Sequence, residues 1–595
     1  MVASLQPPIR GSLLPNRKLA LWAWLVALVL ALLTLFALRP ISIPPLSDAP
    51  TTFDGQRAMG DLRKLAEGYP KRAAGSDAAN RAAIWLAERI KDIGLEPHIE
   101  GFVTRIDGEN TALQNVWAVS KGETSESILL IADRESPPLS TQGANDNASG
   151  VAMLLELARV FTLQSHDRSI VFLWTDGDAY GAVGARQFLA AHLDMRMTSV
   201  LSVRRVATAR PRSIRLDGWS DSDQVTPAWF WALASSAGTT EAKLRTPVPF
   251  VLTQLVRLSM PVGGGSQAPF VAFGLPALSI SAQGDLQQPQ NDTVGSVSAD
   301  ALGRVGRAVE RMVATLDGDA TPRPGSSSSV FFSRSRALPG PAVQLAIFFL
   351  IAPLALVTVD LYAASRRRRR RLGPAWLLYV VRFAPWCAML VFVYFLNLVG
   401  LLPRSPGGGF PPDALVSQSP RYLRAFLLLL LFGAVVWYGH AVERRLSRRR
   451  PVAREATVTV LHIALCAVAL LMLWVNPFSL LLVLPAALLW PLARYGPWPL
   501  SRLPAWGGLT FLAVALLYYG LRLGLGWRVW WYFFLLLENR TVPVSVALLV
   551  AAFVAAAVHL GHHLHRAAGP RRRQTRRRRT PRPTAAQGPA SSGVP

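Results

Sequence analysis

Long apolar runs are spread unevenly along the chain and divide it into two parts. The first run, Leu19–Leu38, is twenty residues long, carries no charge and is flanked by Arg17, Lys18 and Arg39. Twenty helical residues match a hydrocarbon core of about 30 Å. We predict an uncleaved transmembrane anchor here, because Leu38-Arg39-Pro40 does not resemble the small-residue site of a cleaved signal peptide.

The second half of the chain is dominated by further apolar runs. Most of them are as long as a membrane-spanning helix requires, so they predict an all-α transmembrane bundle of about seven helices. The aromatic segment Gly526–Leu537 is expected to lie at the membrane surface between the last two, or to form a partial span. The runs cover residues 341–363, 374–402, 422–440, 456–475, 478–493, 507–524 and 543–562.

The region from Phe53 to about Asp317, between the anchor and these runs, has the pattern of an α/β domain. Short apolar runs bounded by polar residues predict buried strands, and amphipathic segments between them predict helices. Alternating strands and helices predict a largely parallel sheet with helices on both faces. We expect strands at Ser127–Ala132, Ile170–Thr175, Val200–Val203 and Ala277–Ser281, and helices at Asp77–Ile93, Gly150–Phe161 and Gly181–Ala191.

Positive charge follows the apolar runs. The formal net charge is +27, although 51% of the residues are hydrophobic, and arginine clusters lie at 366–371, 444–454 and 571–582. With the N-terminus in the cytoplasm and the spans counted as above, all three clusters fall on the cytoplasmic side, as the positive-inside rule requires. Their position beside apolar runs indicates a lipid membrane as the partner, and not nucleic acid.

These patterns predict a multi-pass membrane protein with both termini in the cytoplasm. The large domain is expected outside it, on the periplasmic side if the source is bacterial. The predicted segments are a cytoplasmic N-terminus (1–18), the anchor (19–38), a linker (39–52), the extracytoplasmic domain (53–317), a second linker (318–340), the bundle (341–565) and a basic cytoplasmic tail (566–595).

The most specific string in the chain is Gly143–Gly150, which reads GANDNASG. Small residues here predict a tight turn that opens the following helix. The turn places one carboxylate, Asp146, at the end of the sheet and beside a helix N-terminus, which favours an anion.

Five other strings, in the order and spacing expected, make the region similar to a known family. They are Tyr69–Ser76, Gln114–Val116, Asp176–Gly184, Gly274–Ala277 and Asn291–Thr293. With the turn, they resemble the signature of the co-catalytic di-zinc aminopeptidases (aminopeptidase Y type, peptidase family twenty-eight of the metallopeptidases). The family also includes glutamate carboxypeptidase, glutaminyl cyclase and the endoplasmic-reticulum metallopeptidase, which adds a C-terminal multi-span region. The resemblance implies a zinc-aminopeptidase-like fold for the α/β domain.

In that family, five side chains hold two zinc ions that share an aspartate, and a glutamate takes the proton of the bridging water. The resemblance implies ligand positions at Asp133, Asp146, Ala179, Arg204 and Gln288, and the general-base position at Asp178. Only Asp146, the shared aspartate, keeps the family's residue. Alanine offers no metal donor, and arginine brings a permanent positive charge. From these replacements we expect no cofactor, or zinc if the family activity persists.

We expect the Arg204 guanidinium to replace the charge of the metal beside Asp146 and Asp133. The predicted function is a membrane-anchored pseudopeptidase whose outer domain binds a peptide or protein. Two alternatives stay open: an active zinc-dependent aminopeptidase with altered ligands, and a transporter or assembly factor whose outer domain is regulatory. Acids at the predicted strand ends, Glu135 and Asp176 among them, would also suit calcium, or would be solvated loop acids with a salt bridge.

Overall fold

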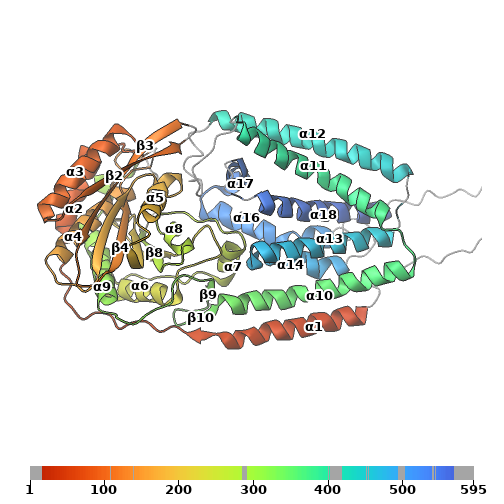
Figure 1. The fold of residues 1–595 in the computed structure, drawn as a ribbon, viewed down its shortest axis with the longest axis horizontal. Coiled ribbons are helices and arrows are strands. Elements are labelled where there is room, and N and C mark those ends of the chain that lie inside the picture. Colours follow the sequence, from red (N-terminus) through yellow and green to blue (C-terminus); the bar gives the residue numbers. More distant parts are fainter. Residues whose placement is uncertain are drawn as a thin grey trace, which may run out of the picture.

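The computed structural model describes residues 17–106, 109–137, 140–284, 291–399, 401, 419–449, 452, 454–492, 503–538, 542 and 544–568. Its α/β part is built on a seven-stranded sheet in the order β2-β3-β5-β4-β6-β8-β7 (Figure 1). The strands are β2 (His98–Ile106), β3 (Glu109–Ser120), β4 (Glu126–Asp133), β5 (Ser169–Thr175), β6 (Arg196–Val203), β7 (Ser213–Asp217) and β8 (Ala277–Gln283).

The centre of the sheet is parallel and its edges are antiparallel. Strands β5, β4, β6 and β8 run parallel to one another. Strand β3 pairs antiparallel with β5 and with β2, and β7 pairs antiparallel with β8. The α/β class is confirmed, and the parallel arrangement holds for the four central strands of a mixed sheet.

Helices cover both faces of this sheet. On one face lie α2 (Gly55–Gly68), α3 (Asp77–Ile93), α4 (Ser149–Thr162), α6 (Ala228–Thr240) and α9 (Ala299–Asp317), and on the other α5 (Val183–Ala191) and α8 (Ala268–Ala272). Strand β4 is covered from both sides, which explains its continuous apolar sequence. Its residues Ile128 and Leu130 enter one core, and Leu129 and Ile131 enter the other, because successive strand side chains face opposite ways.

Parts of the two expected linkers form a second, three-stranded antiparallel sheet. Its order is β1 (Arg39–Pro40), β10 (Arg336–Pro339) and β9 (Ser329–Phe331). Strand β1 follows α1 (Arg17–Leu33) and the short helix η1 (Thr34–Ala37), while β10 leads directly into α10 (Gly340–Arg367). This sheet therefore joins α1 and α10 where both meet the α/β domain (Figure 1).

The remaining helices form a bundle beside the α/β domain (Figure 1). Four shorter elements, which belong to the α/β domain and not to the bundle, are η2 (Ala144–Ala148), η3 (Asp178–Tyr180), α7 (Val251–Ser259) and η5 (Val294–Ser296). The bundle contains α10, α11 (Gly373–Leu398), α12 (Ser419–Arg449), α13 (Arg454–Val475), η7 (Pro477–Ser479), α14 (Leu480–Leu489), η8 (Trp490–Leu492), α15 (Leu503–Gly507), α16 (Thr510–Arg522), η9 (Gly526–Arg528), α17 (Val529–Glu538) and α18 (Val544–Ala568).

Five helices within the described residues are long and apolar enough to cross a membrane: Gly340–Arg367, Gly373–Leu396, Phe426–Leu446, Glu455–Val475 and Val544–Gly561. Three apolar helices are shorter: Leu21–Ala37, Pro477–Leu489 and Thr510–Arg522. These helices support association with a membrane. The count of about seven spans in the bundle, the spanning anchor and the segment boundaries stay predictions.

Helix α10 begins at β10 and runs away from the α/β domain (Figure 1). The arginine cluster 366–371 therefore lies at the far end of the bundle. There Arg368 and Arg370 pair with Glu455, at the start of α13. The predicted topology requires this arrangement, although the side of the membrane that the far end faces stays a prediction.

Candidate functional site

The Gly143–Gly150 turn connects the end of β4 to α4. A side chain at Gly143 would meet the Ser136 Cβ atom at 2.5 Å, and its φ of +58° also favours glycine. Asp292, from the Asn291–Thr293 string, fixes the turn backbone: its two carboxylate oxygens accept from the backbone N–H groups of Asn145 (2.7 Å) and Asp146 (2.9 Å). The turn is thus held so that Asp146 stands at the carboxyl end of the sheet.

Arg72, from the Tyr69–Ser76 string, supports the preceding loop. Its side chain is fully buried. It donates hydrogen bonds to the carbonyl oxygens of Arg134 (3.0 Å), Gln142 (2.6 Å), Gly143 (2.8 Å) and Tyr69 (3.3 Å). The arginine of this string therefore shapes the loop that leads into the turn. The sequence indicated the string but not this contact.

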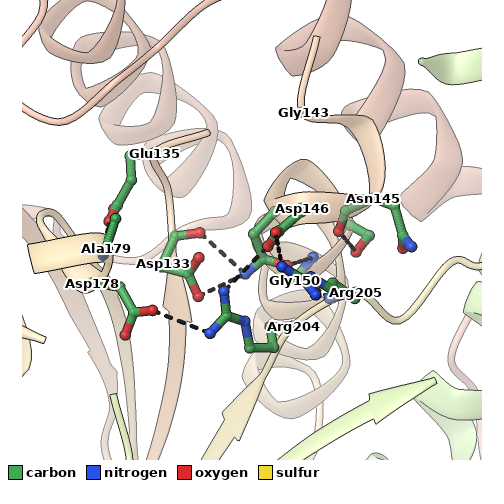
Figure 2. Close-up of polar contacts among 12 residues, drawn as sticks. Asp133, Glu135, Gly143, Asn145, Asp146, Gly150, Asp178, Ala179, Arg204 and Arg205 are labelled. Carbon is green, nitrogen blue, oxygen red and sulfur yellow. Dashed lines mark hydrogen bonds and ion pairs between the residues drawn. The ribbon is translucent and has the colours of Figure 1, made fainter. Parts of the chain in front are cut away.

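The structure brings Asp133, Asp146, Asp178 and Arg204 together at the carboxyl ends of the parallel strands, as expected. Figure 2 shows Arg204 between Asp146 and Asp178. Its guanidinium lies 3.4 Å from Asp146 Oδ1 and 3.3 Å from Asp178 Oδ2. Although burial alone would lower the pKa of Arg204, the carboxylates of Asp133, Asp146 and Asp178 hold it well above its usual value. Arg204 therefore carries its charge in the middle of three acids.

A second arginine, Arg205, completes the pairing of Asp146. Its guanidinium lies 2.5 Å from Asp146 Oδ2, on the side away from Arg204 (Figure 2). Burial by itself would raise the pKa of Asp146, but the guanidinium groups of Arg205 and Arg204 bring it to about 2. Sequence reasoning missed Arg205, whose backbone has a φ of +53°. Both carboxylate oxygens of Asp146 are thus engaged by cations.

Two neighbouring acids hold protons more tightly than usual. Burial raises the pKa of Asp133 to about 7, with Arg204 opposing the rise and Asp178 and Asp146 adding to it. Burial also raises the pKa of Glu135, and Asp176 adds to the effect. Glu135 accepts from the Ala179 backbone N–H at 3.1 Å through Oε1, while its buried Oε2 has no hydrogen-bond partner within the described residues.

The remaining members of the predicted set are engaged elsewhere or lie outside the description. Asp176 forms a fully buried ion pair with Arg134 at 2.7 Å. Asp178 also accepts from Ser266 Oγ at 2.8 Å. Ala179 presents only a methyl group, and Gln288 lies outside the described residues. Among the described residues, no group of three or more His, Cys, Asp or Glu side chains is arranged to hold a metal ion.

The histidines of the domain lie away from these carboxylates. His192 pairs with Glu100 at 2.7 Å, and His98 stacks on Trp117 with ring centroids 4.2 Å apart. His166 is buried and lies 2.8 Å from Ser120 Oγ. In the described part of the domain, no imidazole is therefore available to the site.

Comparisons with known proteins agree with the resemblance seen in the sequence. Residues 115–313 match the family model "Peptidase family M28". The chain is 25% identical over 171 residues to the alkaline phosphatase isozyme conversion protein of Escherichia coli, covering 25% of this chain and 50% of that protein. It is 35% identical over 100 residues to the BOS complex subunit ncln of Danio rerio, covering 15% of this chain and 18% of that protein. The chain thus spans at most half the length of these curated relatives.

Solved structures similar to this chain include those of a zinc aminopeptidase and a glutaminyl cyclase. The zinc aminopeptidase BSAP of Bacillus subtilis has 13% identity and a TM-score of 0.39, covering 46% of this chain and 98% of that one. The glutaminyl cyclase of Porphyromonas gingivalis has 18% identity and a TM-score of 0.37, covering 44% of this chain and 99% of that one. The family-model match supports the assignment of residues 115–313, as one domain within a longer chain, to peptidase family M28.

Proposed function

We propose that the α/β domain is a membrane-anchored pseudopeptidase, which binds a peptide or protein outside the cytoplasm without zinc-dependent cleavage. The observation that carries the proposal is the pairing of Asp146 with Arg204 and Arg205. In the family that the sequence resembles, this aspartate is shared by two zinc ions. Here two guanidinium groups supply the positive charge that stabilises it.

The residues present do not fit a pair of zinc ions. Catalytic zinc takes about three protein ligands per ion. A zinc ion at Asp146 would have to displace Arg204 and Arg205, and Ala179 would give it no donor atom. Asp133, with its pKa raised to about 7 by burial, would also have to release a proton before it could bind a metal. These features support a site that is kept together by arginine and not by metal.

The same arrangement suits the carboxyl terminus and carbonyl groups of a peptide. Ligands of open α/β sheets bind outside the carboxyl ends of the parallel strands, where this site lies. The side chains of Arg204 and Arg205 are 29% and 50% exposed, so their N–H groups can donate to a carboxylate or carbonyl oxygen of a ligand. The Asp146 and Asp178 carboxylates beside them are almost buried and already paired with arginine. The exposed guanidinium groups are therefore the donors that face a ligand.

Metal analysis tests this proposal directly. We expect full-length protein, purified in detergent without chelator, to contain far less than one zinc ion per chain when its metal content is measured by elemental mass spectrometry. It should release no N-terminal residue from aminoacyl-p-nitroanilides above a chelator-treated blank. One or two zinc ions per chain, together with chelator-sensitive release, would establish the alternative of an active aminopeptidase.

A variant of the same chain controls the metal measurement. Ala179→Glu combined with Arg204→Asp returns two ligand positions to acidic residues, so it should retain more zinc than the unchanged protein after identical dialysis. Equal zinc in both proteins, at one or more per chain, would count against the role given to the arginines.

A cavity of about 620 Å³ in the bundle favours a second candidate function, that of a transporter or assembly factor. Its walls are mainly apolar side chains from α11, α12, α13, α17 and α18. Asp221–Asp223 and Met260–Gly263 of the α/β domain contribute to the same walls. An apolar ligand, such as a lipid acyl chain, would therefore contact the bundle and the outer domain together.

Filling this cavity should weaken the binding of an apolar probe. Leu429 lines the cavity, whereas its neighbour Leu430 on α12 does not. We expect Leu429→Trp to weaken 1-N-phenylnaphthylamine binding to the full-length protein about fivefold, roughly 1 kcal/mol. Leu430 is exposed and does not line the cavity, so Leu430→Trp should leave the binding unchanged. Equal binding by both variants would remove the cavity as the binding site.

A further inference from the structure

Three arginines from three different elements meet at the junction of the α/β domain and the bundle. Arg215 lies on β7, Arg257 on α7 and Arg522 at the end of α16. They surround one carboxylate, Asp217, at N–O distances of 3.5 Å, 3.3 Å and 2.5 Å respectively. Within this cluster the positive charges outnumber the negative charge by two.

The three arginines line a cavity of about 450 Å³. Its walls also include Trp219, Gln283 and Tyr518, and none of the described residues that line it is acidic. Asp217 itself does not line the cavity. The cavity therefore presents guanidinium groups to whatever fills it, which gives it the electrostatics of an anion site.

Arg257 is the most buried of the three. Its side chain is 8% exposed and lies over the ring of Trp219, 4.4 Å from the centroid. Its buried Nε atom has no hydrogen-bond partner in the part of the chain that the structure describes. Burial lowers the pKa of Arg257 to about 10, so the group is still charged at neutral pH. Arg257 is thus a buried cation at the cavity wall that uses only part of its donor capacity.

The cavity lies where apolar helices meet the α/β domain. Helix α7 is fixed to the bundle by Asn476, which donates to the Leu258 carbonyl oxygen at 2.7 Å, and by Ser479, which donates to that of Ser259 at 2.9 Å. Shortly after Arg522, Trp527 and Trp530 are 75% and 41% exposed. Exposed tryptophan at the end of apolar helices is typical of the membrane–water interface.

We propose that this cavity binds the phosphate group of an anionic phospholipid of the surrounding leaflet. Phosphate oxygens would accept from the three guanidinium groups that line the cavity, while the acyl chains stay in the bilayer beside α16. Phosphate suits planar guanidinium donors in particular. The lipid would then contact the α/β domain and the bundle together, and would stabilise the packing of one against the other.

Titration of dioleoyl phosphatidylglycerol into full-length protein in detergent, followed by native mass spectrometry, tests the site. We expect one lipid to bind more tightly than the rest. Arg215→Gln and Arg522→Gln should each weaken that first binding roughly tenfold, the worth of one charge-assisted hydrogen bond. Arg257→Gln should do the same or more. The variants at Arg215 and Arg522 keep the buried Arg257, so the test does not depend on whether Arg257→Gln folds.

Arg528→Gln is the matched control, because Arg528 is exposed nearby and does not line the cavity. Its lipid affinity should equal that of the unchanged protein. An equal loss in Arg528→Gln and Arg522→Gln, or no loss in either, would overturn the proposal. Competition with inorganic phosphate distinguishes a phospholipid headgroup from free phosphate as the ligand. If inorganic phosphate displaces the lipid at equal concentration, the site takes free phosphate and the lipid assignment is wrong.

Discussion

Replacing Arg72 by methionine should lower the free energy of unfolding of the α/β domain by about 3–5 kcal/mol, because it leaves several buried carbonyl groups without a donor. The arginine is fully buried and reaches four carbonyl oxygens. Methionine has a comparable volume but no N–H group. The loss can be measured as the temperature at which the α/β domain of the full-length protein becomes sensitive to protease.

The same substitution on the surface provides the control. Arg81 is exposed on α3, so Arg81→Met should change stability by less than about 0.5 kcal/mol. If the two variants lost protease resistance at the same temperature, the hydrogen bonds of Arg72 would not be what holds the loop before Gly143.

Regular elements could be predicted from the sequence because their signals are local. Helix α3 has the predicted bounds, since Ser76 caps its first turn and Gly94, at a φ of 92°, ends it. The central strands are apolar on both faces and so read as uninterrupted runs. By contrast, β1, β9 and β10 have two to four residues each, which is too short for a periodic pattern. Strands β9 and β10 pair across a short turn, whereas β1 pairs with β10, almost 300 residues further along the chain.

The acidic residues of the site could be predicted from the sequence, but of its two arginines only Arg204 could. Asp133 ends β4 and Arg204 follows β6, so neighbouring parallel strands bring them to one edge, and family motifs fixed their positions. Arg205 was missed because a strand pattern sends successive side chains to opposite faces. Its positive φ breaks that rule and turns it back toward Asp146. Such a conformation leaves no signal in an arginine-rich segment.

Removing the Arg204 guanidinium should destabilise the α/β domain markedly. We expect Arg204→Ala to lower the free energy of unfolding by about 2–3 kcal/mol at neutral pH. The figure is below that for a fully buried ion pair, because the side chain is 29% exposed and its contacts are 3.3–3.4 Å long. Arg204→Lys keeps the charge and should lose less.

The pH dependence distinguishes this charge effect from a simple loss of packing. The pKa of Asp133 is raised to about 7 in the folded domain from an unfolded value of about 3.9. Because the folded domain binds this proton more tightly than the unfolded chain, protonation of Asp133 stabilises the folded domain. This stabilisation is complete below about pH 4 and is lost as the pH rises through 7. Without Arg204, which opposes the rise, the folded pKa increases further and the loss continues to higher pH. The difference between Arg204→Ala and the unchanged protein should grow from pH 6 to pH 8.5.

A double-mutant cycle isolates the responsible pair. Asp133→Asn removes the buried carboxylate, so above pH 7 it should return part of the stability that Arg204→Ala loses. At pH 6 the same substitution should return less, because Asp133 is then largely protonated. Thermal unfolding of the four full-length proteins at both pH values measures the coupling. If Arg204→Ala melted at the temperature of the unchanged protein at pH 8.5, arginine would not be replacing a metal charge at this site.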